Sequence, residues 1–275
     1  MAIVTISHEM GSGGSKIGMA LAERLECRYV DQDMIAQAAQ RYGCLAERLT
    51  QLDETKPSLL ERFDAETRHY IMVLQSAVLD VAEADNVVIM GRAGQVLLRG
   101  IAHALRVFVR APLELRVRRV MEDLASRAGE TVDFRTTADT VRRCDQQKVG
   151  RMRYLFDVDW RDPALYDLVL NTEKLTVPAA VELILSVLRR SELAATEASR
   201  QAVRDRALAA RVRCALAAHA ETRQYRINVE VDQGVVRLES AAALEAAARV
   251  ARSVPGVTDV QEQPLEVPPI PPFVA

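Results

Sequence analysis

The chain has few cysteines and no long apolar run. The four cysteines are scattered, with no C-x-x-C pair and no histidine pairing nearby: Cys27, Cys44, Cys144 and Cys214. This usage predicts reduced, mostly structural thiols, as in a cytosolic protein. No stretch of about 18 apolar residues is present to span a bilayer, and the first residues lack the basic segment of a signal peptide. We therefore expect a cytoplasmic protein without a membrane partner.

An excess of one charge sign is also absent. With 36 Lys and Arg against 38 Asp and Glu, the formal net charge is −2, which argues against a protein devoted to nonspecific nucleic-acid binding. The four histidines form no metal-ligand pattern, and no Ser/His/Asp or Cys/His grouping is visible. At 275 residues and 49% hydrophobic composition, the chain is globular and has room for one ordinary domain plus a smaller one.

The most informative segment lies near the amino terminus. A β-branched apolar run, Ile3–Ile6, leads into the glycine-rich turn Gly11–Ser15, and a helical pattern follows. That strand–loop–helix order predicts a phosphate-binding loop, in which backbone N–H groups and the helix N-terminus hold an anion. The loop is irregular. In the register G-x-x-x-x-G-K-[ST], His8 takes the first glycine position and Gly14 the lysine position, whereas Ser15 fits.

Each residue of this loop has an expected role. Backbone N–H groups would hold a phosphate, and the Ser15 hydroxyl would ligate Mg²⁺. The residues expected to bind the phosphate-bearing cofactor are Gly11, Ser12, Gly13, Gly14, Ser15 and Lys16. Lys16 stands two places beyond the usual lysine. It either reaches a phosphate and acts in catalysis or is a solvated helix residue.

Downstream, short buried strands alternate with amphipathic helices. We expect strands at 28–31, 86–92, 105–110 and 167–172, and helices at 32–42, 45–52, 58–84, 112–128, 138–153 and 177–189, with a polar loop at 129–137. This alternation predicts an α/β fold, with a parallel sheet covered by helices on both faces. Ligands bind such sheets at the carboxyl ends of the strands. The glycine loop, Asp31, Arg92 and Arg110 all fall there.

Several charged residues are candidates for the site, each with a plainer alternative. Asp31 either binds a sugar or base or caps the next helix, and Arg92 either clamps a phosphate or forms a surface ion pair. From Arg106 to Arg153 the chain carries 12 Lys and Arg against 7 Asp and Glu. Two basic helices there flank a polar loop, as a lid over a triphosphate requires, although a solvated helical face gives the same pattern. Their basic residues include Arg116, Arg119, Arg142, Arg143, Lys148, Arg151 and Arg153.

The last third of the chain has a different organisation. Residues 191–202 are expected to form a linker or an exposed helix, and 203–267 an α-β-β-α-β unit. Within that unit, helices are expected at 203–220 and 241–253, and strands at 225–231, 235–238 and 257–261. Five of the ten prolines lie between Pro264 and Ala275, which predicts an extended tail over 268–275.

Taken in order, the motifs of residues 1–190 resemble the cytidylate kinase-like family, a branch of the P-loop nucleoside monophosphate kinases. The segment Ile6–Gly18 is similar to the family opening "ISREYGSGG". The resemblance continues through Tyr29–Asp31, Val88–Arg92, Val109–Met121, Asp145–Lys148, Trp160–Pro163 and Tyr166–Thr172. Well-characterised cytidylate kinases differ in having a lysine at the position of Gly14 and an acid at that of Met90.

The resemblance implies a three-layer kinase fold, ATP with Mg²⁺ as donor, and a nucleoside monophosphate such as CMP as acceptor. Asp31, Arg92 and Arg110 would bind the substrate, and the arginines of 116–153 would form the lid. Lys16, Arg116, Arg119 and Lys148 would then be catalytic. Two other interpretations stay open: a degenerate kinase that senses a nucleotide, and a kinase of another small phosphate-bearing metabolite.

Residues from about 200 to 267 resemble a BON domain. The resemblance rests on Ile227–Val231, Gly234–Leu238 and Val254–Val260, a hairpin followed by a "PGV…V" strand. It implies an interaction module with a regulatory or oligomerising role, so we expect a homo-oligomer or a protein partner through this domain. A degenerate kinase would signal through it.

Overall fold

The computed structural model describes residues 2–39, 65–128 and 132–265. Its larger sheet has five parallel strands in the order β2-β3-β1-β4-β5. These are β1 (Ile3–His8), β2 (Arg28–Val30), β3 (Val87–Met90), β4 (Ala104–Arg110) and β5 (Leu168–Asn171). Because β1 is central, the loop that follows it leaves the middle of the carboxyl edge.

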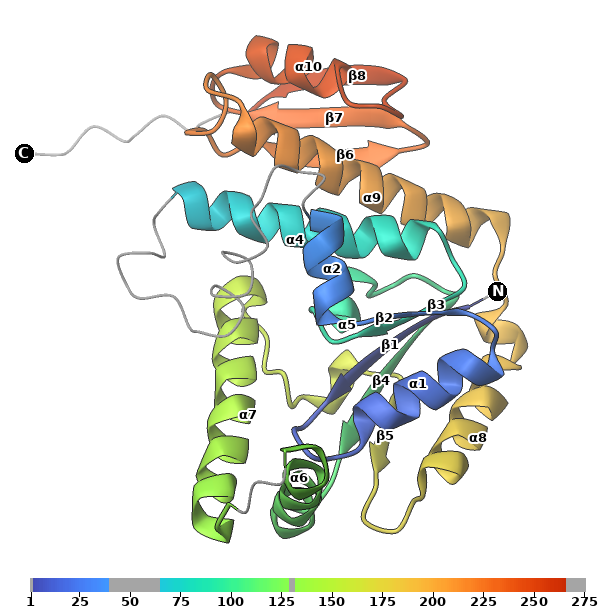
Figure 1. The fold of residues 1–275 in the computed structure, drawn as a ribbon. Helices are drawn as coiled ribbons and strands as arrows, with labels where there is room; N and C mark the ends of the chain where they lie inside the picture. The colour runs from blue at the N-terminus through green and yellow to red at the C-terminus, as the bar shows by residue number, and fades with distance from the viewer. Residues whose placement is uncertain (1, 40–64, 129–131, 266–275) are drawn as a thin grey trace, which may run out of the picture.

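Helices cover both faces of this sheet, because its strands are apolar on both sides. In β3, Val87 and Ile89 enter one core, and Val88 and Met90 enter the other. One face carries α1 (Gly14–Arg24) and α8 (Val177–Leu188), as Figure 1 shows. The other carries α2 (Gln32–Ala39), α4 (Ala65–Glu83) and α5 (Gly94–Leu97). The predicted three-layer α/β fold is confirmed.

Two helices extend beyond the carboxyl edge of the sheet, α6 (Leu113–Ala128) and α7 (Phe134–Phe156) (Figure 1). The expected loop at 129–137 is wrong in its second half, because Asp133 caps α7 by accepting a hydrogen bond from the Thr136 amide at 3.0 Å. The helix also continues past residue 153. It stops where Asp157 adopts the left-handed conformation, at φ 51°.

A second, three-stranded sheet forms the carboxyl-terminal unit. Strands β6 (Asn228–Asp232) and β7 (Val235–Ser240) are antiparallel, and β8 (Asp259–Pro264) pairs with β7 in parallel. Helices α9 (Glu197–Ala218) and α10 (Leu244–Arg252) complete the predicted α-β-β-α-β order. Two short 3-10 helices, η3 (Pro163–Leu165) and η4 (Ser191–Leu193), lie earlier in the chain.

Helix α9 belongs to both cores. It begins inside the segment expected to be a linker, where Thr196 and Ser199 form a capping box. One set of its side chains packs with α4 and the large sheet: Val203, Ala207, Ala210 and Cys214. Another set packs under the small sheet: Leu208, Ala209, Val212 and Leu216. Figure 1 shows α9 between α4 and the small sheet.

Some expectations lie outside the described residues: the helix at 45–52, parts of those at 32–42 and 58–84, the tail at 268–275, and Cys44. Within the described part, none of the helices is both long and apolar enough to cross a membrane.

Candidate active site

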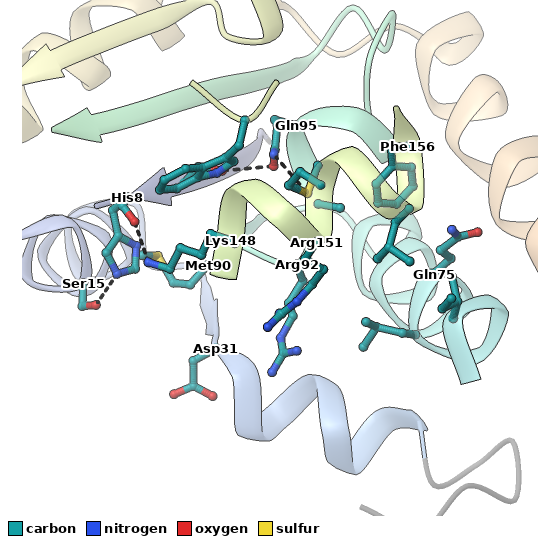
Figure 2. A pocket seen from close by; sticks show the side chains of 18 of the residues that line it. His8, Ser15, Asp31, Gln75, Met90, Arg92, Gln95, Lys148, Arg151 and Phe156 are labelled. Carbon is teal, nitrogen blue, oxygen red and sulfur yellow. Dashed lines mark hydrogen bonds between the residues drawn. The ribbon is translucent and has the colours of Figure 1, made fainter. Parts of the chain in front are cut away.

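A cavity of about 350 Å³ opens at the carboxyl edge of the large sheet, beside the glycine loop (Figure 2). Its walls come from β1, α1, the ends of β2 and β3, and the helices α4, α5 and α7. The lining residues are Ser7, His8, Ser15, Tyr29, Asp31, Ile71, Leu74, Gln75, Met90, Gly91, Arg92, Ala93, Gln95, Lys148, Arg151, Met152, Leu155, Phe156 and Trp160.

The glycine loop has the backbone shape that an anion site requires. Gly11 and Gly13 adopt φ values of 77° and 85°, which other residues rarely do. Gly13 is the N-cap of α1 and supplies no side-chain cap, so the first N–H groups of the helix stay available to a ligand. A Cβ added at Gly13 would meet no atom within 4 Å, so this side of the loop is open.

Behind the loop, Arg116 is buried and fully engaged with protein groups. Its Nη1 donates to the Met10 carbonyl at 3.1 Å and to Asp145 Oδ2 at 2.6 Å, while the Glu9 carboxylate lies 3.5 Å from its Nε. Asp145 in turn accepts from the Met10 amide. The catalytic role expected of Arg116 stays a prediction. Arg116 is 6% exposed and positions the loop.

Arg119 also donates hydrogen bonds to protein groups behind the loop. Its guanidinium donates to Thr172 Oγ1 at 2.9 Å and to the Thr172 carbonyl at 2.8 Å, and the Thr172 hydroxyl donates to the Ser12 carbonyl at 2.7 Å. Arg119 Nη1 also reaches the Ser12 carbonyl, at 3.5 Å. These contacts fasten the loop to the end of β5, and the catalytic role expected of Arg119 stays a prediction.

Lys148 supplies a cation from α7 to the cavity wall. Its Nζ donates to the His8 carbonyl at 2.8 Å and lies 5.4 Å from the centroid of the Trp160 ring. Burial lowers the pKa of Lys148, and the nearby Asp145 carboxylate opposes that effect. The amine therefore sits directly beside the first residue of the loop.

His8 and Ser15 face each other across the start of the loop. His8 Nε2 lies 3.5 Å from Ser15 Oγ. Burial first, and then the Lys148 charge, lower the pKa of His8 to about 3, so its ring is neutral near pH 7.

Arg92 and Arg151 bring two guanidinium groups into the cavity. Figure 2 shows their side chains running in the same direction, toward the end of the cavity where Asp31 lies. Burial, and then the Arg151 charge, lower the pKa of Arg92 to about 9. Two like charges held together suit a ligand with at least two negative charges, such as a phosphate monoester.

The backbone that carries Arg92 is unusual. Gly91, Arg92 and Ala93 have consecutive φ values of 68°, 55° and 60°. For a residue with a side chain, the left-handed conformation costs roughly 1–2 kcal/mol. The strained residues lie where β3 turns into α5, and this backbone conformation directs the Arg92 side chain into the cavity. Backbone strain of this kind is common at binding sites.

Asp31 caps the next helix, one of its two expected roles, while the binding of a sugar or base stays a prediction. One carboxylate oxygen accepts the amides of Asp33 and Met34, at 3.1 and 3.2 Å, and so caps α2. The same side chain lines the cavity opposite Arg92.

Lys16 and Arg110 lie outside the cavity lining, as do the loop residues Gly11, Ser12, Gly13 and Gly14. Lys16 is exposed and forms an ion pair with Asp123 of α6 at 3.1 Å. Arg110, at the end of β4, is exposed as well. Conversely, the lining contains Gln75 of α4 and Gln95 of α5, which sequence reasoning missed. Arg151, which the sequence places with Lys148 on a basic helix, lines the cavity as well.

Comparison with known proteins agrees with this geometry. The model of the cytidylate kinase-like family matches residues 3–174. The chain belongs to the cytidylate kinase-like family. A BON domain model matches residues 204–269, so the chain also carries a BON domain.

Individual relatives are distant. A cytidylate kinase from Methanococcoides burtonii is 29% identical over 174 residues, covering 62% of this chain and 88% of that protein. One from Staphylothermus marinus is 28% identical over 186 residues, covering 67% and 94%. Among solved structures, an uncharacterized protein from Eubacterium ventriosum aligns with a TM-score of 0.55 and 19% identity, over 69% of this chain and all of that one. This last likeness supports the fold alone.

Proposed function

We propose that the protein transfers the γ-phosphoryl group of ATP to a nucleoside monophosphate, with a CMP-like acceptor favoured. An oxygen of the acceptor phosphate forms the new bond to phosphorus as the bond to the ADP oxygen breaks, giving ADP and a nucleoside diphosphate. One observation carries the proposal: the cavity holding Arg92 and Arg151 reaches Ser15, at the uncapped N-terminus of α1. An acceptor phosphate and a loop-bound phosphate would therefore be neighbours.

Lys148 is proposed as the cation of this transfer. The usual loop lysine is replaced by Gly14, and Lys16 is turned toward Asp123. Lys148 is held at the His8 carbonyl and lines the same cavity as Ser15. Its charge is placed to stabilise negative charge that develops on the transferring group. Burial of the Lys148 amine beside Trp160 lowers the local dielectric constant, which strengthens that interaction.

A magnesium ion fits this arrangement only as a companion of the nucleotide. Within the described residues, no group of three or more His, Cys, Asp or Glu side chains could hold a metal. Mg²⁺ commonly binds through substrate phosphates with few protein ligands. The Ser15 hydroxyl is the loop group that would hold it, and the ion would neutralise phosphate charge.

The test is ADP release from ATP and Mg²⁺ with each common nucleoside monophosphate. We expect release above background with CMP or a close analogue. In Arg92→Ala, the KM for the acceptor should rise about 10–100-fold, since a hydrogen bond to a charged group contributes about 1.5–3 kcal/mol. Arg237→Ala is the matched control, because Arg237 is an exposed arginine of β7 outside the cavity and outside the expected lid. Nucleotide binding without ADP release would favour the sensor instead, and absence of both would refute the two functions together.

A further inference from the structure

A second cavity of about 350 Å³ lies where α4 and α9 meet the segment 219–227 that precedes β6. We call it the junction cavity. Its wall includes Met72 of α4, Arg213 of α9, and Arg223, Tyr225, Arg226 and Ile227. It shares no lining residue with the cavity beside the glycine loop.

The junction cavity carries positive charge that no carboxylate of the described residues neutralises. Arg213 donates to the Val229 carbonyl at 3.1 Å, and Arg223 and Arg226 are exposed. Among the described residues, the ion pairs nearby involve other arginines: Arg211 with Asp80 and Glu83, Arg249 with Glu221, and Arg252 with Glu262. None of these pairs places a carboxylate on the three arginines of the cavity.

Arg213 shows the cost of this arrangement. Burial, and then the charge of Arg206, lower its pKa, so both the protein interior and a like charge act against the guanidinium. A buried charge is normally paired or bound to a counterion. An anion in the junction cavity would supply that partner.

The rest of the wall indicates what the anion is attached to. The Tyr225 ring is 41% exposed, and Ile227 and Met72 are partly exposed apolar side chains beside it. Small-molecule sites combine apolar walls with a few placed polar groups, and arginine is suited to phosphate. We propose that the junction cavity binds a small organic phosphate, whose phosphate contacts the three arginines and whose planar or apolar part covers Tyr225 and Ile227.

Helix α4 connects this cavity with the first. Met72 lines the junction cavity, while Ile71, Leu74 and Gln75 line the cavity beside the loop. A ligand that shifts α4 would therefore change the wall of the cavity beside the glycine loop, where the acceptor is proposed to bind. This consequence rests on the proposed phosphotransfer, whereas binding at the junction does not.

The experiment is calorimetric titration of the full-length protein with ATP. The variant is Arg223→Ala with Arg226→Ala, both exposed. The control is Arg237→Ala with Arg252→Ala, which removes the same charge from exposed positions outside the junction cavity. We expect wild type and control to bind two ATP molecules per chain, and the variant to bind the second at least about tenfold more weakly.

A second experiment distinguishes a soluble organic phosphate from a lipid headgroup as the ligand of the junction cavity. Flotation with phosphatidylglycerol vesicles that is lost in the Arg223/Arg226 variant but kept in the control would assign the site to a lipid headgroup. Identical ATP isotherms and identical flotation for wild type and variant would overturn the proposal. The second ATP should also bind to Arg92→Ala, so a failure of the kinase assay and a failure of this site are distinguishable.

Discussion

The side chain of His8 occupies the space into which a side chain at Gly14 would extend. A Cβ added to Gly14 would overlap His8 Cβ and lie 2.6 Å from His8 Cγ. The histidine at the first glycine position and the glycine at the lysine position are therefore coupled departures from the usual loop. A histidine at the first position requires a glycine at the position where other loops carry lysine.

The first prediction follows from this overlap. Gly14→Ala should destabilise the protein by about 1–3 kcal/mol, because overpacking a filled site forces neighbours to move. The same substitution in a His8→Gly background should cost little, since the space is then vacant. Thermal or urea unfolding of the two single variants and the double variant measures the coupling. Additive effects would show that the residues do not compete for space.

The second prediction concerns which lysine serves the loop. Lys148→Met keeps the apolar stem near Trp160 and removes the charge, so kcat should fall about 10²–10³-fold. Lys148→Arg should recover part of the loss. Lys16→Met should change kcat less than about twofold, because Lys16 is exposed and paired with Asp123. Steady-state kinetics alongside melting temperatures separates lost catalysis from lost folding. The reverse ranking would assign the role to Lys16.

A third prediction concerns pH. The pKa of His8 is about 3 in the folded protein, against 6.5 for an ordinary histidine. Between these values the unfolded chain binds a proton that the folded chain does not, so stability should decrease as pH falls from 6.5 toward 3. The melting temperature of wild type should therefore fall more steeply over pH 6.5 to 4 than that of His8→Asn. Parallel curves would mean that His8 titrates normally.

A fourth prediction compares two ion pairs. Arg116 and Asp145 are both buried, so Asp145→Asn should cost about 3–5 kcal/mol by leaving a buried cation without its carboxylate. Arg142 and Asp139 form an exposed pair on the same helix as Asp145, and Asp139→Asn should cost at most about 0.5 kcal/mol. Urea unfolding of both variants gives the comparison. Similar losses would contradict the bracing role of Arg116.

Much of the fold was predictable because the local signals agree. The apolar runs 86–92 and 105–110 and the helix pattern after Gly14 all occur where the structure has strands and a helix. The misplaced boundary at 129–137 has a local cause, since the Asp133 cap was overlooked. The order α-β-β-α-β was also visible. That α9 packs on two cores was not, because the pattern of an amphipathic helix does not name its partners.

The site was predictable only in part, for a physical reason. Sequence reasoning located Asp31, Arg92 and Lys148, which line one cavity. It could not distinguish an arginine that faces a ligand from one that braces backbone, because Arg116 and Arg119 have the same spacing in either role. Their partners in the structure include Asp145 and Thr172, which lie 29 and 53 residues away in sequence.

Helix α9 makes the two halves of the chain inseparable in practice. A cut after residue 190 would leave the first domain without Val203, Ala207, Ala210 and Cys214, and would open the back of α4 to water. Helix α4 also lines the cavity beside the glycine loop, so the cut would also disturb the wall where the substrate is proposed to bind. The first helix of the carboxyl-terminal unit thus completes the core of the kinase domain. The two domains should therefore melt in a single transition.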